Sequence, residues 1–127
     1  IPRTMPALLK AHKVSNKAAK AGFDWNKVED IIDKVHEEVD ELKEAIKNKD
    51  QKNVEEEIGD ILFSLVNVSR YVEVNPEEAL RKTIGKFIRR FHYVEKKIAS
   101  SDKEMCETEL TELNILWDEA KKKEQLR

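Results

Sequence analysis

Two acidic segments of this sequence have the residue types and the spacing for metal chemistry. The first is Glu37-Glu38-Val39-Asp40-Glu41, and fifteen residues later the second is Glu57-Ile58-Gly59-Asp60. In each segment two carboxylates lie three residues apart, which on a helix places both on one face. Four carboxylates that meet repel one another and are costly to bury unless a cation binds between them. Carboxylate oxygens suit Mg²⁺ and Mn²⁺, so the spacing predicts a divalent-metal site if the two segments lie side by side.

The apolar pattern places both segments on neighbouring helices. In the first helix, expected from about residue 27 to 48, the apolar positions at helical spacing are Ile31, Val35, Val39, Leu42 and Ile46. Glu38 falls inside this apolar stripe, an uncommon position for a carboxylate. The polar segment 48–53 leads to a second helix, expected from about 53 to 74. Because so short a connection makes two helices antiparallel neighbours, we expect the acidic segments to meet.

The second of these helices carries two lines of side chains. The apolar line, expected to face the core, is Val54, Ile58, Ile61, Leu65, Val68 and Val72. The polar line beside it is Glu57, Asp60, Ser64, Asn67 and Tyr71, and steps of three and four residues keep it on one face. Because it carries no charged residue after Asp60, it differs from an ordinary solvated face, and we count Asn67 among the predicted ligand-binding residues. Gly59 costs about 1 kcal/mol relative to alanine in mid-helix, which close packing or room for a ligand would offset.

Three further helices are predicted. One runs from about residue 6 to 21 and ends at Gly22, which is well placed as a C-terminal cap. After it, Phe23 and Trp25 are expected to close the end of the core, with the alternative that one of them borders a ligand pocket. Another begins after Asn75, a suitable capping residue, and runs to about residue 100.

The helix that begins after Asn75 is basic and carries Lys86 and Arg90. They are four residues apart and therefore adjacent, so they repel each other unless they meet an anion. Either residue alone more often simply covers helix surface. The final predicted helix spans about 108 to 123, and Trp117 is expected to pack in the core.

Composition indicates an all-α protein and argues against a membrane span and against nucleic-acid binding. The chain has 127 residues, 39% hydrophobic and 39% charged, with three glycines and three prolines. We expect one domain over residues 6–127, built of four to five helices, after a linker-like start at 1–5 that suggests a piece of a longer protein. A net charge of −2 argues against nucleic-acid binding. No apolar run approaches the ~18 residues that a membrane-spanning helix needs. The single cysteine, Cys106, fits a reducing cytoplasm.

The acidic motif also resembles a known family. The pattern EExxE, a gap and then ExxD, continuing as Ile61-Leu62-Phe63-Ser64-Leu65-Val66-Asn67, is similar to the MazG family of nucleoside triphosphate pyrophosphohydrolases. The segments Gly22-Phe23-Asp24-Trp25 and Lys86-Phe87-Ile88-Arg89-Arg90-Phe91, and the late Trp117, share this resemblance. It extends from about Met5 to Lys123 and is greatest to the second of the two tandem domains of many bacterial members.

The resemblance implies an all-α fold, a site and a reaction. It implies Mg²⁺-dependent hydrolysis of nucleoside triphosphates to the monophosphate and pyrophosphate, by a homodimer or higher oligomer. Matching positions imply that Glu38, Glu41, Glu57 and Asp60 are the metal ligands. They also imply that Lys86 and Arg90 contact the phosphates and that Trp117 lies near the nucleotide, and we count Glu38, Glu41, Lys86 and Arg90 as catalytic.

Several alternatives stay open at this point. Glu37, Glu41 and Glu56 are all candidates for the base that accepts a proton from the attacking water. A related all-α enzyme acting on dUTP or phosphoribosyl-ATP would share the metal chemistry, and a non-catalytic helical module would share only the fold. A homodimer is also supported by the wide apolar arc of the helix at 53–74, where Leu62, Phe63 and Val66 lie beside the main stripe.

Overall fold

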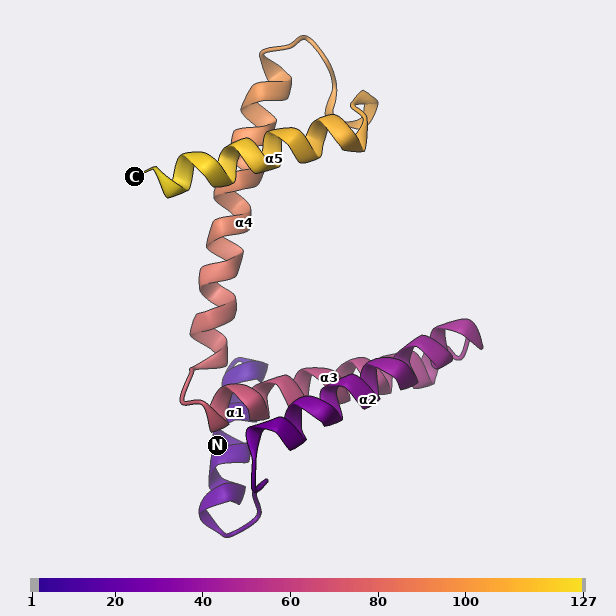
Figure 1. The fold of residues 1–127 in the computed structure, drawn as a ribbon, viewed down its shortest axis with the longest axis vertical. Helices are drawn as coiled ribbons and strands as arrows, with labels where there is room; N and C mark the ends of the chain where they lie inside the picture. Colours follow the sequence, from indigo (N-terminus) through magenta and orange to yellow (C-terminus); the bar gives the residue numbers. More distant parts are fainter. Residues whose placement is uncertain (1–2, 127) are drawn as a thin grey trace. The chain divides into compact units, whose positions relative to one another are not determined.

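The computed structural model of the protein describes residues 3–126. Its α-helices are α1 (Ala7–Lys20), α2 (Val28–Lys47), α3 (Gln51–Tyr71), α4 (Pro76–Ala99) and α5 (Leu110–Gln125), with a short 3₁₀-helix η1 (Met105–Glu107) before α5 (Figure 1). The described part of the chain contains no strand. The prediction of an all-α protein is therefore confirmed.

Capping residues account for where these helices begin and end. The backbone N–H groups of Glu77 and Glu78 donate to Asn75 Oδ1 at 2.9 and 3.2 Å, so Asn75 caps α4 as predicted. Gly22 follows α1 with a φ of +102°, a left-handed conformation that glycine adopts without strain. Asp50 caps α3, because its Oδ1 accepts from the backbone N–H of Asn53 at 3.3 Å. For this reason α3 begins at Gln51, two residues earlier than predicted, and the connection to α2 is only residues 48–50.

The first of two compact units is Ile1–Ala79 and contains α1, α2 and α3. As predicted, α2 and α3 form an antiparallel hairpin, and α1 packs against α3 (Figure 1). The centre of this unit is small, with Ile31 and Ala45 of α2 and Val66 of α3 at most 2% exposed. The hairpin is thus the element that brings residues of the two acidic segments together.

The buried face of α3 differs from the predicted one. Ile58, Leu65 and Val72 of the predicted apolar core line are 45%, 48% and 51% exposed. Glu57 and Ser64 of the polar line are instead buried, each at 9%. The polar line faces α2 because its side chains meet the carboxylate of Glu38 there. The assignment of the apolar line to the core was therefore wrong for these three exposed residues, whereas Val54, Ile61 and Val68 are half-buried.

The second compact unit is Leu80–Arg127 and contains the rest of α4, then η1 and α5. Val94 and Ile98 of α4 and Ala120 of α5 are its buried apolar residues. Trp117, predicted in the core, is half-buried, with its ring 5.2 Å from that of Phe87. Whether the two units form one domain over residues 6–127 stays a prediction. Within the described residues, none of the helices has both the length and the apolar character that crossing a bilayer requires.

Candidate active site

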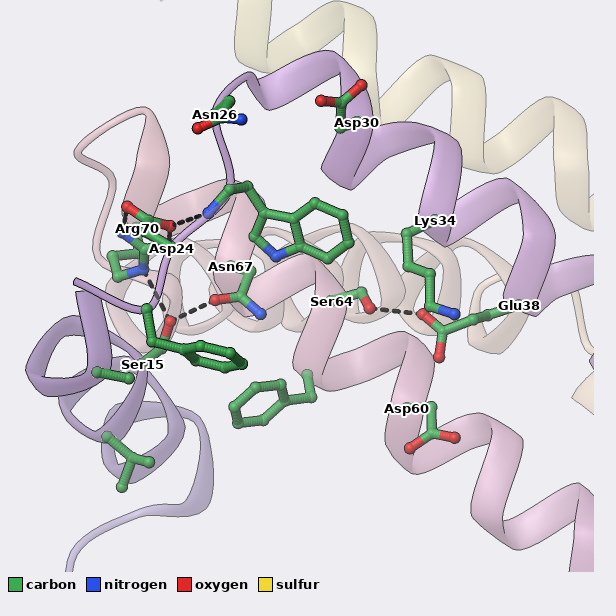
Figure 2. A pocket seen from close by; sticks show the side chains of 15 residues that line it. Ser15, Asp24, Asn26, Asp30, Lys34, Glu38, Asp60, Ser64, Asn67 and Arg70 are labelled. Carbon is green, nitrogen blue, oxygen red and sulfur yellow. Dashed lines mark hydrogen bonds and ion pairs between the residues drawn. The ribbon is translucent and has the colours of Figure 1, made fainter. Parts of the chain in front are cut away.

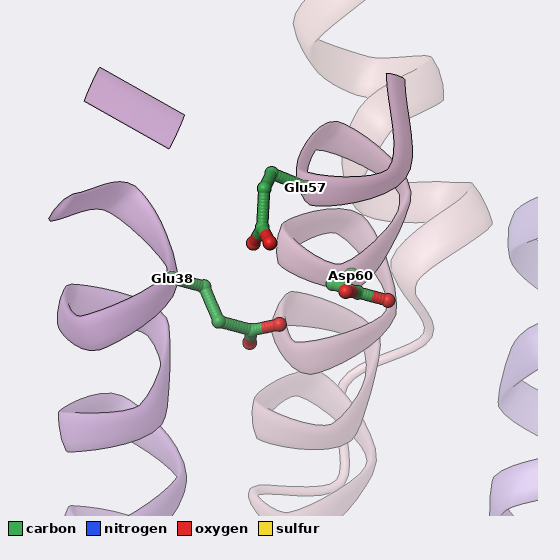
Figure 3. A group of neighbouring side chains, drawn as sticks. All are labelled: Glu38, Glu57 and Asp60. Atoms are coloured by element: carbon green, nitrogen blue, oxygen red, sulfur yellow. The ribbon is translucent and has the colours of Figure 1, made fainter. Parts of the chain in front are cut away.

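Three carboxylates of α2 and α3 converge in the first unit. One carboxylate oxygen from each of Glu38, Glu57 and Asp60 can be chosen so that all lie within 4.8 Å of one another (Figure 3). Glu38 comes from α2, and the other two come from successive turns of α3. The spacing of three residues and the short connection between the helices produce this arrangement, as the sequence predicted.

Glu38 is held in place by a hydrogen bond from the opposite helix. The Ser64 hydroxyl donates to Glu38 Oε1 at 2.5 Å, and the two residues are 9% and 5% exposed (Figure 2). A short bond to a charged acceptor between buried groups restricts the rotamer of that side chain. Ser64 therefore orients Glu38 within the cluster.

Glu57 is the unbalanced member of the cluster. Its Oε2 is buried and, among the described residues, has no hydrogen-bond partner. Burial raises the pKa of Glu57, and the charge of Glu41, a hydrogen bond with Glu41 and the charges of Asp60 and Glu38 raise it further. A buried acceptor without a donor, surrounded by other acids, is the environment that a hard divalent cation stabilises. The donor set therefore fits Mg²⁺ or Mn²⁺.

The other acids of these segments lie at or outside the edge of the cluster. Glu41 is exposed and interacts with Glu57, although it is not one of the three that converge. Glu37 is exposed and lies 3.7 Å from the Nζ of Lys34, and Glu56 is exposed as well. Of the three predicted candidates for the general base, Glu41 is the one that interacts with a member of the cluster, Glu57.

A pocket of about 720 Å³ adjoins the acidic cluster (Figure 2). Glu38 and Asp60 line one end of it, and Asp24 and Arg70 line the other. Its apolar walls come from α1, from the α1–α2 connection and from α3, and they include Val14, Ala18, Phe23, Trp25 and Phe63. Phe23 is 84% exposed and Trp25 is 40% exposed, so they do not close the core. Both line the pocket, whereas the alternative prediction was that one of them borders a ligand pocket.

A polar network that the sequence did not predict closes the end of the pocket away from the acids. Arg70 donates to both carboxylate oxygens of Asp24, at 2.5 and 3.2 Å, and through Nε to Ser15 Oγ at 2.7 Å. Ser15 Oγ in turn donates to Asn67 Oδ1. Three of these residues were missed because α1 shows only a rough apolar stripe, which gives no register for Ser15, and because a lone Asp and Arg have no distinguishing spacing.

Comparison with known proteins agrees with this geometry. Residues 26–95 match the model of the MazG nucleotide pyrophosphohydrolase domain, more than half of the chain. The chain belongs to the MazG family. The matched range contains both acidic segments, Asn67, Lys86 and Arg90, whereas Ser15, Asp24 and Trp117 lie outside it.

Several MazG relatives are similar over most of the chain. A nucleoside triphosphate pyrophosphohydrolase of Escherichia coli K12 is 40% identical over 98% of the chain. A nucleoside triphosphate pyrophosphohydrolase/pyrophosphatase MazG of Thermotoga maritima is 43% identical over 92% of it. The matches cover 48% and 45% of these two relatives, so the chain spans about half their length.

The remaining residues expected of a MazG site lie on the second unit. Arg90 donates to Glu124 Oε2 through Nε at 3.1 Å and through a terminal nitrogen at 3.0 Å, and its guanidinium lies 5.9 Å from the ring of Trp117. Lys86 is exposed on the same helix. Arg90 and Trp117 are thus close together, as residues of one binding surface must be. That these residues bind the nucleotide and face the acidic cluster stays a prediction.

Proposed function

We propose that the protein hydrolyses nucleoside triphosphates to the nucleoside monophosphate and pyrophosphate, with Mg²⁺ or Mn²⁺ as the cofactor. The observation that carries the proposal is the convergence of Glu38, Glu57 and Asp60 within 4.8 Å, together with the buried Oε2 of Glu57, which has no hydrogen-bond partner among the described residues. Two relatives at 40% and 43% identity bear the name nucleoside triphosphate pyrophosphohydrolase, which supports this substrate class.

Glu38, Glu57 and Asp60 would hold the cation, and Glu41 would complete the set from its place beside Glu57. A bound divalent cation would neutralise phosphate charge and polarise the phosphoryl oxygens. Before a cation binds, the hydrogen bond from Ser64 keeps Glu38 oriented toward α3. Without a cation, a triphosphate would be repelled by these carboxylates, which supports a requirement for one.

Glu41 is also the best-placed acid to activate water. It is exposed, so water reaches it, and it contacts the cluster through Glu57. In the proposed step the water oxygen bonds to the α phosphorus, and the Glu41 carboxylate oxygen that does not hold the cation accepts its proton. The bond from the α phosphorus to the oxygen that bridges to the β phosphate breaks. Pyrophosphate leaves with the electron pair of that bond.

The basic helix α4 would bind the phosphates. Lys86 and Arg90 carry the charge needed to stabilise the pyrophosphate leaving group. The indole of Trp117, close to Arg90, offers a flat surface for the nucleotide. These roles rest on the MazG resemblance and on the proximity of Arg90 to Trp117.

We further propose that the active protein is a homodimer or higher oligomer in the cytoplasm. Ile58, Leu62, Phe63 and Leu65 of α3 are 44–48% exposed in the single chain, and such a strip is stabilised by a partner. The only cysteine, Cys106, is exposed and free, which suits a reducing compartment.

The proposal is tested by incubating the protein with each nucleoside triphosphate, with dUTP and with phosphoribosyl-ATP, in the presence of Mg²⁺, and measuring monophosphate and pyrophosphate. Glu38→Gln and Asp60→Asn are expected to lower kcat/KM by about a hundredfold or more, because each removes a charged ligand. Glu55→Gln, an exposed acid of the same helix α3, is the matched control.

Three outcomes would count against the proposal. Release of orthophosphate would contradict cleavage between the α and β phosphates. Full activity of both Glu38→Gln and Asp60→Asn would show that the site is wrong. Turnover of none of these substrates would favour a non-catalytic helical module.

A further inference from the structure

The four-residue network at the end of the pocket has a direction. Arg70 can only donate hydrogen bonds, and an ionised Asp24 can only accept them. Ser15 Oγ accepts from Arg70 Nε and gives its own proton to Asn67 Oδ1. Ser15 and the Arg70 side chain are 6% and 9% exposed, so water competes little for these bonds. In this arrangement the side-chain amide of Asn67 has its oxygen toward Ser15.

This orientation presents nitrogen, and not oxygen, to the pocket. The Asn67 amide nitrogen points away from Ser15, toward the space between the lining side chains (Figure 2). Among residues 3–126 it has no hydrogen-bond partner. The neighbouring acceptors are already used, because Asp24 receives Arg70 and Asn67 Oδ1 receives Ser15. At this position Asn67 itself therefore offers the pocket a hydrogen-bond donor.

The position of Asn67 along α3 relates this donor to the acidic cluster. Asn67 lies seven residues after Asp60 on the same helix face, a separation of about 10 Å at 1.5 Å per residue. That is comparable to the span of a nucleotide from its inner phosphate to the far edge of its base. With the phosphates at the acids, the base would lie among the aromatic walls formed by Phe23, Trp25 and Phe63. Its edge remote from the sugar would then reach Asn67.

We infer that Asn67 selects nucleotides whose base carries a carbonyl on that remote edge, and that Ser15 and Arg70 are positioning residues for its amide. This inference rests on the proposed function for the place of the phosphates. Uracil and guanine offer a carbonyl oxygen there and pair with the amide N–H. Cytosine and adenine carry an amino group, whose N–H would face another donor and leave both unpaired.

The test compares binding of UMP with CMP, and of GMP with AMP, in the presence of Mg²⁺, by calorimetry and by the side-chain amide NMR signal of Asn67. Each carbonyl-bearing nucleotide is expected to bind about tenfold more tightly than its amino partner, the worth of one hydrogen bond. Asn67→Asp, which replaces the donor by an acceptor of the same shape, is expected to reverse the preference. Equal affinities in the unaltered protein, or an unchanged ratio in Asn67→Asp, would overturn the inference.

Two further variants separate positioning from folding. Ser15→Ala frees the amide to rotate and is expected to bring both affinity ratios close to one, whereas Ser15→Thr keeps the hydroxyl and restores them. A merely structural role for Ser15 would change stability and leave the ratios intact, and that result would overturn its assignment. Because binding is measured without turnover, tenfold discrimination combined with no pyrophosphate release would support the inference and contradict the proposed function alone.

Discussion

Glu57 is the acid whose surroundings disfavour its charged form. Its pKa is raised, first by burial and then by Glu41, Asp60 and Glu38, so the folded protein binds its proton more tightly than the unfolded chain does. A raised pKa contributes stability that is fully present below the ordinary value of 4.5 and is lost as pH rises through the raised value. The metal-free protein is therefore expected to lose stability from about pH 4.5 upward, and a cation should reverse the loss.

Glu57→Gln is expected to change stability in opposite directions with and without metal. Without metal at pH 7, removing the buried charge should raise Tm and flatten its decrease with pH. Saturation of the unaltered protein with Mg²⁺, at about a hundredfold excess over Kd, should raise its Tm by about 10 °C. Glu57→Gln should lose most of that rise, as measured by thermal unfolding followed by circular dichroism between pH 4 and 8.

Glu56→Gln is the matched control, because Glu56 is the exposed neighbour on the same helix. It should behave like the unaltered protein in both conditions. A Glu57→Gln protein that keeps the full rise with Mg²⁺ would show that the cation does not bind at this carboxylate.

At the residue scale, sequence spacing predicted which acids converge, but it did not predict the side-chain hydrogen bonds around them. Glu38, Glu57 and Asp60 were predictable because spacing and a short connection suffice to bring them together. The hydrogen bond from Ser64 and the network through Ser15 were not predictable, because they depend on how α2 and α1 pack on α3. Side-chain contacts between separate helices leave no periodic signal in a single sequence.

At the scale of elements, one ion pair ties the connection between α1 and α2 to α3. Arg70 holds Asp24 at 2.5 and 3.2 Å, and nearby the Tyr71 hydroxyl donates to the backbone oxygen of Asn26 at 2.7 Å. Asp24→Asn is expected to lower the free energy of unfolding at pH 7 by about 1–2 kcal/mol, because Arg70 loses its charged acceptor. Urea denaturation measures this directly.

The pH dependence of that loss identifies its cause. The hydrogen bond from Arg70 is the largest influence on Asp24 and lowers its pKa below the ordinary value of 3.8. A lowered pKa contributes stability above 3.8 that is lost as pH falls through the lowered value. The difference between the unaltered protein and Asp24→Asn should therefore shrink below about pH 4. A difference that is the same at pH 3 and pH 7 would mean that the ion pair is not responsible, and Asp33→Asn, an exposed acid of α2, serves as control.

Two glycines in different conformations should respond oppositely to alanine. Gly22 has a φ of +102°, so Gly22→Ala should destabilise the protein by about 1 kcal/mol. A Cβ on Gly59 would meet no atom within 4 Å, so Gly59→Ala should stabilise the helix by about 1 kcal/mol. Thermal unfolding of both variants at low protein concentration measures these changes. Destabilisation by Gly59→Ala would instead indicate a close neighbour on that face, such as a second copy of the chain.

Among the elements, boundaries were predicted to within about three residues, and burial was predicted less well. Caps such as Asn75 have strong local preferences, so the start of α4 was predictable. The buried face of α3 was not predictable from its apolar residues. Glu57 and Ser64 are buried there because they meet Glu38 of α2. Ile58, Leu65 and Val72 remain exposed as a consequence.

At the scale of the whole molecule, the exposed apolar line of α3 predicts self-association. Leu65→Glu is expected to convert a dimer or larger oligomer into monomers, because a charge on a buried interface is unpaired. The single chain should still fold, since Leu65 is 48% exposed in it. Sedimentation velocity measures the oligomeric state. Lys52→Glu, an exposed charge reversal on the same helix, is the control, and an unchanged mass for Leu65→Glu would place any interface elsewhere.

The α2–α3 hairpin also bears on the order in which the chain folds. The four predicted ligands fall between residues 38 and 60, and the helices that hold them are joined by residues 48–50. Contacts so close in sequence form early, because little loop entropy is lost. The hairpin is therefore expected to form before the contacts that involve α4 and α5. Pulse-labelled hydrogen exchange during refolding should accordingly find α2 and α3 protected first, and more so when Mg²⁺ is present.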